Sequence, residues 1–104
     1  MKVSVVVPVY NVADFLDECL RSVLGEADGD VELVCVDDGS TDATWEIASA
    51  FAEGRGGIVK AVRQENAGAG AARNAGLAVA TGDWIMFLDG DDVLAKGHLF
   101  AWKG

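Results

Sequence analysis

The sequence is poor in proline, histidine, cysteine and basic residues, and each shortage excludes something. Its 104 residues include one proline, one histidine and two cysteines. With so little proline and half its residues hydrophobic, the chain is neither disordered nor collagen-like. Cys19 and Cys35 lack the spacing of metal ligands and lie in apolar runs, which indicates small buried side chains. His98, the single histidine, receives no role.

The shortage of basic residues bears on the partners. Eight basic residues face seventeen acidic ones, for a net charge of -9, so we expect no nucleic acid partner. A phosphate-bearing ligand would need a cation to help bind it. No apolar run approaches the roughly 18 residues that span a bilayer, and Pro8 interrupts the first one. We therefore expect a cytoplasmic location, at the inner face of the membrane if the chain is part of a longer protein.

Apolar, β-branched runs alternate with helical patterns along the chain. Strands are predicted at residues 3–7, 31–36, 58–63 and 84–88, and helices at residues 14–24, 42–52 and 71–80. On the first helix the predicted apolar face holds Phe15, Cys19, Leu20, Val23 and Leu24, and on the second Trp45, Ala48, Phe51 and Ala52. The alternation predicts a three-layer α/β/α, Rossmann-like fold with a mainly parallel sheet, and the length predicts one domain over residues 1–104.

Polar residues collect where each predicted strand ends. Because ligands bind beyond the carboxyl ends of parallel strands, these residues should share one rim of the sheet. They are Tyr10 and Asn11 after the first strand, Asp37 and Asp38 after the second, Asn66, Gly68 and Gly70 after the third, and Asp89, Asp91 and Asp92 after the fourth.

The run Asp89-Gly90-Asp91-Asp92 is the strongest of these signals. Three carboxylates within four residues repel one another unless a cation lies among them. Oxygen ligands suit Mg²⁺ or Mn²⁺, which commonly bridge carboxylates to substrate phosphates. The alternative is a solvated turn whose aspartates cap the following helix.

Asp37 and Asp38 open a second polar loop, in which Thr41 or Asp42 is predicted to cap the following helix. A carboxylate at this strand end could accept hydrogen bonds from a nucleobase N–H or a ribose hydroxyl. The alternative is a loop with a helix cap and no ligand. Tyr10 likewise offers a flat face for a stacked base, or else shields the rim.

The turn Gly68-Ala69-Gly70 resembles the start of a dinucleotide-binding fingerprint. That fingerprint, however, follows the first strand and carries a third glycine, and here Arg73 takes that place. We therefore reject the dinucleotide interpretation. Arg73, or the backbone N–H groups of the turn, could instead lie near a phosphate or a donor sugar; the alternative is that Arg73 pairs with an acid.

Four motifs in fixed order resemble the N-terminal half of family 2 glycosyltransferases, which have the GT-A fold: residues 8–11, 37–42, 66–76 and 82–92. The resemblance implies that Pro8, Tyr10 and Asp38 line a nucleotide base pocket, with Asp37 close by. It places Asp89 and Gly90 near the nucleotide. Asp91, together with Asp89 and Asp92, would hold Mn²⁺ or Mg²⁺ at the diphosphate.

The same resemblance implies transfer of a sugar, with inversion, from a nucleotide-diphosphate sugar to an acceptor hydroxyl of a saccharide or other molecule. UDP is the family's commonest nucleotide. Family members are generally much longer, and their second half carries the acceptor site and the general base, so no catalytic residue is assigned here. The alternative is a sugar-nucleotide and metal-binding module without turnover. With the sheet ending at its fourth strand, we expect that strand to be an apolar edge that pairs with a second copy.

Overall fold

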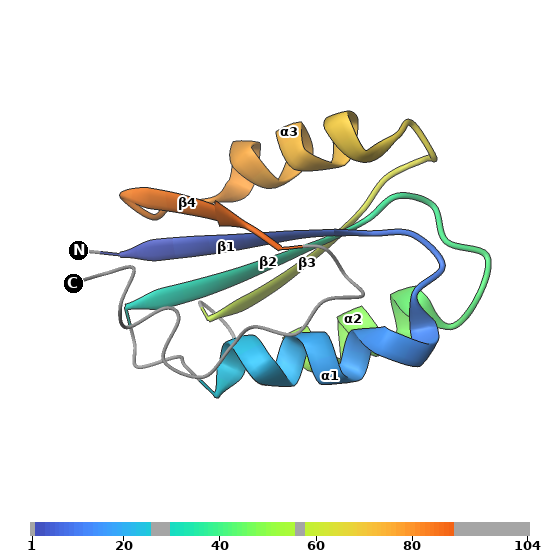
Figure 1. Cartoon of the computed structure of the whole chain (residues 1–104), viewed down its shortest axis with the longest axis horizontal. Helices are drawn as coiled ribbons and strands as arrows, with labels where there is room; N and C mark the ends of the chain where they lie inside the picture. Colours follow the sequence, from blue (N-terminus) through green and yellow to red (C-terminus); the bar gives the residue numbers. More distant parts are fainter. Residues whose placement is uncertain (1, 26–29, 56–57, 89–104) are drawn as a thin grey trace.

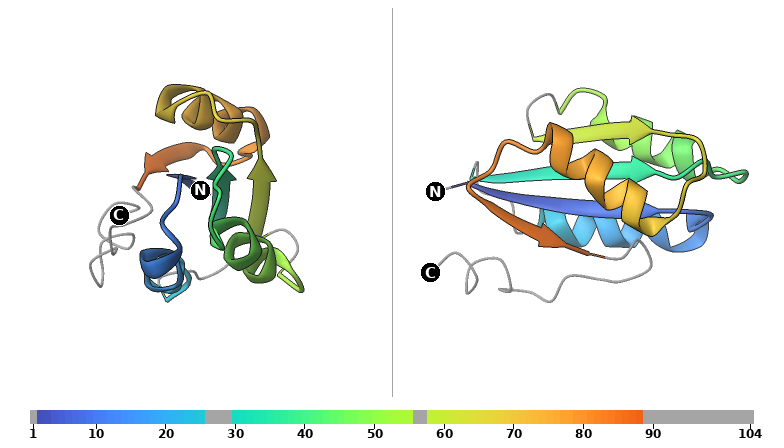
Figure 2. Two further views of the ribbon diagram at one scale, coloured as in Figure 1. Left: turned by 90° about the vertical axis from the view of Figure 1, so that its right-hand side faces the viewer. Right: turned by 90° about the horizontal axis from the view of Figure 1, so that it is seen from above.

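The computed structural model describes residues 2–25, 30–55 and 58–88. In these ranges the elements are β1 (Val3–Val9), α1 (Ala13–Leu24), β2 (Val31–Asp37), α2 (Thr44–Ala52), β3 (Val59–Arg63), α3 (Ala69–Val79) and β4 (Trp84–Phe87). The strands form one parallel sheet in the order β3-β2-β1-β4. Helices α1 and α2 cover one face and α3 the other (Figure 1), and the end-on view in Figure 2 shows the three layers. The predicted α/β/α fold is confirmed.

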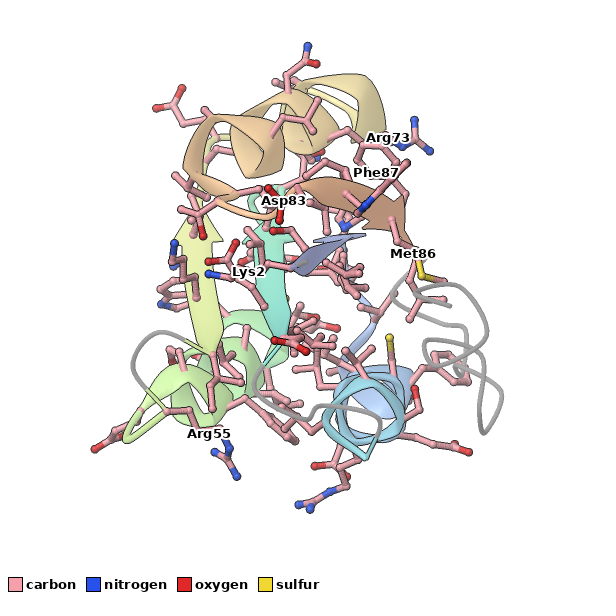
Figure 3. The ribbon with its side chains drawn as sticks, turned by 90° about the vertical axis from the view of Figure 1, so that its left-hand side faces the viewer. Lys2, Arg55, Arg73, Asp83, Met86 and Phe87 are labelled. Carbon is pink, nitrogen blue, oxygen red and sulfur yellow. The ribbon has the colours of Figure 1, made fainter. Side chains whose placement is uncertain are left out.

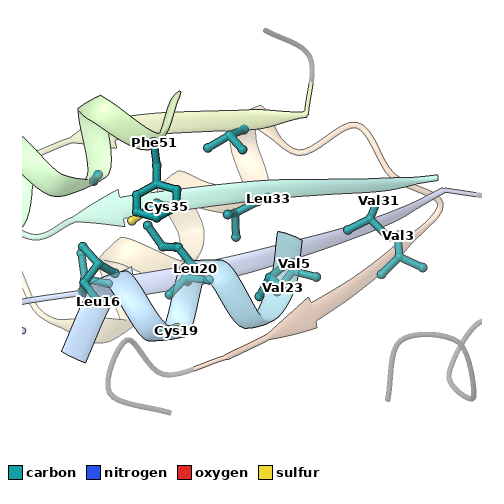
Figure 4. Close-up of a cluster of buried hydrophobic side chains, with 14 residues drawn as sticks. Val3, Val5, Leu16, Cys19, Leu20, Val23, Val31, Leu33, Cys35 and Phe51 are labelled. Atoms are coloured by element: carbon teal, nitrogen blue, oxygen red, sulfur yellow. The ribbon is translucent and has the colours of Figure 1, made fainter. Parts of the chain in front are cut away.

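The sheet separates two apolar clusters, because side chains alternate between its faces. On the α1 and α2 side, odd-numbered valines of β1 pack with residues of both helices, as Figure 4 shows. On the α3 side, Val6 and Ala72 pack with Val34 and Val36 of β2. Strands β1 and β2 are buried on both faces, which is why their sequences are almost continuously apolar.

Helix α1 buries Leu16 in place of Phe15, so that part of the predicted apolar face is wrong. Leu16 and Cys19 are completely buried together with Leu20 and Val23, whereas Phe15 is 55% exposed. Successive residues of an α-helix are about 100° apart around its axis. Once the stripe from Leu16 to Val23 faces the sheet, Phe15 lies beside it in solvent.

Strand β1 continues through Pro8, where we expected it to end. Val9 accepts a hydrogen bond from Asp38 of the β2 side (2.9 Å), and Val6 accepts one from Leu88 of the β4 side (3.1 Å). Alternation along the strand therefore directs the Pro8 nitrogen toward β4, whose last paired residue is Phe87, opposite Val6. Proline is tolerated there because its missing N–H has no strand residue to pair with.

The helices begin at slightly different residues from those predicted. Helix α2 begins at Thr44 instead of Asp42, and α3 begins at Ala69 directly after Gly68, whose φ is 98°. The predicted cap by Thr41 or Asp42 is wrong, because the N-cap residue of α2 is Ala43, although Asp42 Oδ1 accepts a hydrogen bond from the Thr44 N–H (2.9 Å). None of the helices in the described ranges has the length and apolar composition needed to cross a membrane.

Gly76 lets α3 pack unusually close to the sheet. A methyl group on Gly76 would collide with Val6 Cγ1 and would lie 3.3 Å from Val36 Cγ2. Because the Val6 and Val36 side chains are completely buried and have no room to move aside, only a residue without a side chain fits at this position.

Glu32 is a buried carboxylate that the sequence did not lead us to expect. It lies on β2 and faces α3, near the amino ends of the strands, with no exposed surface. Its Oε1 accepts hydrogen bonds from Ser4 Oγ (2.8 Å) and Thr81 N (2.9 Å), and Thr81 Oγ1 donates to Oε2 (3.0 Å). Lys60 Nζ forms an ion pair with Oε2 at 2.9 Å. These contacts join β1, β2, β3 and the segment between α3 and β4.

The same contacts control the ionisation of Glu32. Burial alone would raise its pKa, but hydrogen bonds from Lys60, Thr81 and Ser4 outweigh it and lower the pKa to about 2. Figure 3 looks onto this end of the sheet, where the Lys2 backbone N–H also donates to Asp83 Oδ2 (2.9 Å). The amino end of the sheet is thus closed by polar contacts, whereas its carboxyl end carries the candidate site.

Candidate functional site

The loops that follow β1, β2 and β3 meet at one rim, as predicted. Asn11 N donates to Ser40 Oγ (2.9 Å), which joins the first loop to the second. Asn66 Nδ2 donates to the Asp38 carbonyl oxygen (3.0 Å), which joins the second loop to the third. The fourth loop begins with Asp89 and lies outside the described residues.

Tyr10 and Asp38 contribute to a single small pocket at this rim. Its volume is about 110 Å³, and it is lined by Pro8, Val9, Tyr10, Asp38, Ala69 and Ala72. Tyr10 is 47% exposed and Asp38 only 5%. The pocket is well below the roughly 300 Å³ of ordinary small-molecule sites, so it suits one ring of a ligand, not a whole nucleotide. It combines apolar walls with one carboxylate.

The Asp38 carboxylate organises the loop between β3 and α3. Its Oδ1 accepts hydrogen bonds from Gln64 Nε2 and Ala67 N, both at 2.8 Å. Its Oδ2 accepts one from Gly68 N (3.0 Å) and a longer one from Asn66 Nδ2 (3.4 Å). Burial raises the pKa of Asp38, but the bonds from Gln64, Ala67 and Gly68 lower it more, and the net shift is downward. The pocket therefore presents a negative charge at neutral pH.

Asp37, the neighbour of Asp38, does not line the pocket. The side chain is completely buried, and its Oδ1 accepts hydrogen bonds from the backbone N–H (3.1 Å) and the hydroxyl of Ser40. Its Oδ2 lies 3.5 Å from Arg63 Nε and accepts no hydrogen bond from the part of the chain described. The predicted nucleotide contact of Asp37 stays a prediction, and the observed contacts make the residue an anchor for the loop.

Arg73 projects from the first turns of α3 toward the end of β4. Its guanidinium carbon lies 6.0 Å from the centre of the Phe87 ring, and Figure 3 labels both side chains. Among the ion pairs of residues 2–25, 30–55 and 58–88, none involves Arg73. Within these ranges the Arg73 charge therefore lies against an aromatic ring at the end of β4.

The predicted metal ligands Asp89, Asp91 and Asp92, with Gly90 between them, lie outside the described residues. Within the described ranges, no group of three or more histidine, cysteine, aspartate or glutamate side chains could hold a metal ion. The prediction of a Mg²⁺ or Mn²⁺ site therefore depends on the sequence of residues 89–92 and on the family resemblance.

Two residues of the site were not assigned a role from the sequence. Gln64 donates a hydrogen bond to the Asp38 carboxylate, and Asn11 joins the loop after β1 to the loop after β2. No pattern marks Gln64, because it follows a strand end where any polar residue is acceptable. Asn11 could have been found, since asparagine is one of the few residues that tolerate a left-handed backbone in a tight turn.

The fold and the pocket define an α/β domain with a small pocket at the carboxyl rim of a parallel sheet, the place where such folds generally bind ligands. The chain belongs to glycosyl transferase family 2, whose model matches residues 4–101. The predicted family and GT-A fold are both confirmed.

Individual relatives agree with this assignment. The glycosyltransferase GlyA of Streptococcus pneumoniae is 43% identical over 94% of the chain. The structure of S. aureus TarS 1-349 in complex with UDP-GlcNAc matches 99% of the chain with a TM-score of 0.85 and 36% identity. The mannosyltransferase PcManGT from Pyrobaculum calidifontis, in complex with GDP-Man and Mn²⁺, matches 94% with a TM-score of 0.78 and 31% identity. The chain spans 14% of GlyA and 30% of each of the two solved chains.

Proposed function

We propose that this chain is the donor-binding part of an inverting glycosyltransferase that takes a nucleotide-diphosphate sugar, most simply a UDP-sugar, and transfers its sugar to an acceptor hydroxyl. The observation that carries the proposal is the ring-sized pocket between Tyr10 and Asp38. Two related structures support it, because one contains UDP-GlcNAc and the other contains GDP-Man.

In this proposal the base enters the pocket and the Tyr10 ring stacks on it. Pro8, Ala69 and Ala72 form apolar walls, and the Asp38 carboxylate accepts a hydrogen bond from a base N–H. Because Asp38 is already held by backbone N–H groups of the next loop, its position is set before the ligand arrives. Such preorganisation lowers the entropic cost of binding.

The leaving diphosphate would lie between α3 and the end of β4. The first turn of α3 offers backbone N–H groups and the positive end of the helix dipole, and Arg73 adds a full charge. Asp89 and Gly90 are proposed to face the ribose, and Asp91 with Asp89 and Asp92 to hold Mn²⁺ or Mg²⁺. When bound, the cation would neutralise charge on the diphosphate. The general base and the acceptor site are assigned to no residue of this chain.

Titration with UDP, GDP and TDP, each with and without Mn²⁺, tests the proposal. We expect Mn²⁺-dependent binding of UDP, and we expect Asp91→Ala to weaken it more than about tenfold because the cation loses a ligand. Asp14→Ala, which removes an exposed acid of α1, is the control. If no nucleotide binds under any condition, the proposal fails. Measured sugar transfer by the isolated chain would decide between a complete transferase and a binding module without turnover.

We also propose that the chain self-associates through β4. This strand is an edge of the described sheet, and Trp84 and Phe87 on it are 51% and 43% exposed. A strand at the edge of a sheet can pair through its backbone groups with the edge strand of a second copy. Light scattering should show a dimer at high concentration, and Trp84→Lys should weaken it about tenfold by removing an aromatic contact from each copy. Leu77→Lys, which alters an exposed residue of α3, should not. A wild-type monomer at high concentration contradicts the proposal.

The proposed compartment is the cytoplasm, or its membrane face for a longer protein. Cys19 and Cys35 are both buried and are not joined to each other in a disulfide, in keeping with a reducing compartment. Cell fractionation of the native protein tests this assignment, and recovery outside the cytoplasmic and membrane fractions would reject it.

A further inference from the structure

Asn11 has an unusual backbone conformation next to the pocket. Its φ is 50°, in the left-handed region, and it is the only non-glycine residue of the described ranges with a positive φ. Asparagine adopts this conformation more readily than most residues. The residue stands between Tyr10, which forms one wall of the pocket, and Val12, which precedes α1. The chain thus turns sharply directly after the proposed stacking residue.

The side chain and backbone of Asn11 bind the loop after β2. Thr41 N donates to Asn11 Oδ1 at 2.8 Å, and Thr41 Oγ1 donates to the same oxygen at 3.3 Å. Asn11 N donates to Ser40 Oγ at 2.9 Å. We call these three hydrogen bonds the Asn11 latch. They connect residues 29 and 30 positions apart in the sequence.

Ser40 connects the Asn11 latch to the buried carboxylate of Asp37. The Ser40 hydroxyl that accepts from Asn11 donates its own hydrogen to the carboxylate of Asp37, which has no exposed surface. Hydrogen bonds that run in series toward an ionised acceptor polarise and strengthen one another. Arg63 Nε lies 3.5 Å from the second Asp37 oxygen and holds the carboxylate from the other side. The loop after β1 is therefore tied to a fixed point in the core.

We infer that Asn11 is a positioning residue that sets the distance between Tyr10 and Asp38 for nucleotide binding, and that Asp37 anchors it through Ser40. The covalent order of the chain carries this inference, because Tyr10 directly precedes Asn11 and Asp38 directly follows Asp37. Tyr10 is thus attached to Asn11, and Asp38 is attached to Asp37, which Ser40 connects to Asn11. The inference rests on the proposed function, in that it takes the pocket to bind a nucleotide base.

The test uses the fact that Tyr10 is the only tyrosine of the chain. Labelling with 3-fluorotyrosine therefore gives one fluorine resonance, which reports on Tyr10 alone. In Asn11→Gly the positive φ is kept without strain, and the side chain is lost together with the Oδ1 acceptor of the two Thr41 hydrogen bonds. We expect this variant to shift or broaden the resonance and to bind UDP, in the presence of Mn²⁺, about tenfold more weakly, which corresponds to one or two lost hydrogen bonds.

Three further variants sharpen the result. Asn11→Asp keeps the acceptor oxygen and should restore both the resonance and the UDP affinity. Ser40→Ala removes the acceptor of the Asn11 N–H and should resemble Asn11→Gly. Ser49→Ala, which removes a hydroxyl of α2 that donates to the Glu46 carbonyl oxygen, should behave as wild type. Circular dichroism confirms that each variant is folded.

An unchanged Tyr10 resonance and an unchanged UDP affinity in Asn11→Gly would overturn the inference. If that variant is unfolded, Ser40→Ala decides by the same two measurements. If the wild-type chain binds no nucleotide, the proposed function fails, whereas the Tyr10 resonance of the free protein still tests whether the latch positions this ring.

Discussion

Replacing Glu32 with glutamine is expected to lower the free energy of unfolding by about 3 kcal/mol at neutral pH. The carboxylate is fully buried and receives hydrogen bonds from Ser4 and Thr81 and an ion pair from Lys60. Its pKa falls from an ordinary 4.5 to about 2 on folding. Because a tenfold change in proton affinity is about 1.4 kcal/mol, this lowering corresponds to about 3 kcal/mol of stability.

The contribution of Glu32 to the free energy of unfolding depends on pH, because the pKa is lowered on folding. A carboxyl group whose pKa is lowered by folding stabilises the protein above its unfolded pKa, about 4.5 for Glu32, and the contribution is lost as the pH falls toward 2. Urea unfolding of the wild type between about pH 6 and about pH 2 should show this loss, and Glu32→Gln should flatten it. Glu18→Gln, which alters an exposed glutamate of α1, is the matched control. Equal stability of Glu32→Gln and wild type at neutral pH would show that the contacts of Glu32 are not stabilising.

Replacing Asp38 with asparagine is expected to weaken UDP binding about thirtyfold, or about 2 kcal/mol, the value of a hydrogen bond to a charged group. Four N–H donors surround the Asp38 carboxylate, from Gln64, Asn66, Ala67 and Gly68. An amide group would turn an N–H₂ toward at least one of them, so the loop after β3 would also lose stability. Calorimetric titration with UDP and Mn²⁺ measures the affinity, and thermal unfolding measures the loop's contribution.

Asp83→Asn is the control for this experiment. Asp83 also accepts a backbone hydrogen bond, from Lys2, but at the opposite end of the sheet. The Asp83→Asn substitution should therefore leave the affinity for UDP unchanged. If Asp38→Asn binds UDP as tightly as wild type while remaining folded, Asp38 does not contact the base.

The order and type of the elements could be predicted because the apolar periodicities are long and regular. Strands β1 and β2 carry apolar residues on both faces, and α1 carries them at helical spacing. The sequence could not show which of two neighbouring apolar residues is buried. Phe15 and Leu16 are both large and apolar, and only the packing of α1 on the sheet selects Leu16. Pro8 was expected to end its strand because the sequence does not show that β4 stops short of it.

The site could be predicted in outline, since strand ends of a parallel sheet must share a rim. Tyr10, Pro8 and Asp38 were placed together by that rule and by the family resemblance, and the structure brings them into one pocket. The direction of a side chain is harder to predict, as Asp37 shows, because adjacent aspartates of an extended segment point to opposite sides. The buried contacts of Glu32 could have been predicted, because a lone glutamate inside a strand buried on both faces must have polar partners.

Gly76 does not line the pocket, but it governs how closely α3 can approach β1. Ala69 and Ala72, which form the α3 wall, are on the same helix, and Ala72 is one turn before Gly76 on the face that meets the sheet. The opposite wall belongs to β1, the strand whose Val6 touches position 76. The spacing of these two walls thus depends on the missing side chain at Gly76, which lets α3 lie against Val6. The proposed base pocket therefore depends on a glycine that does not line it.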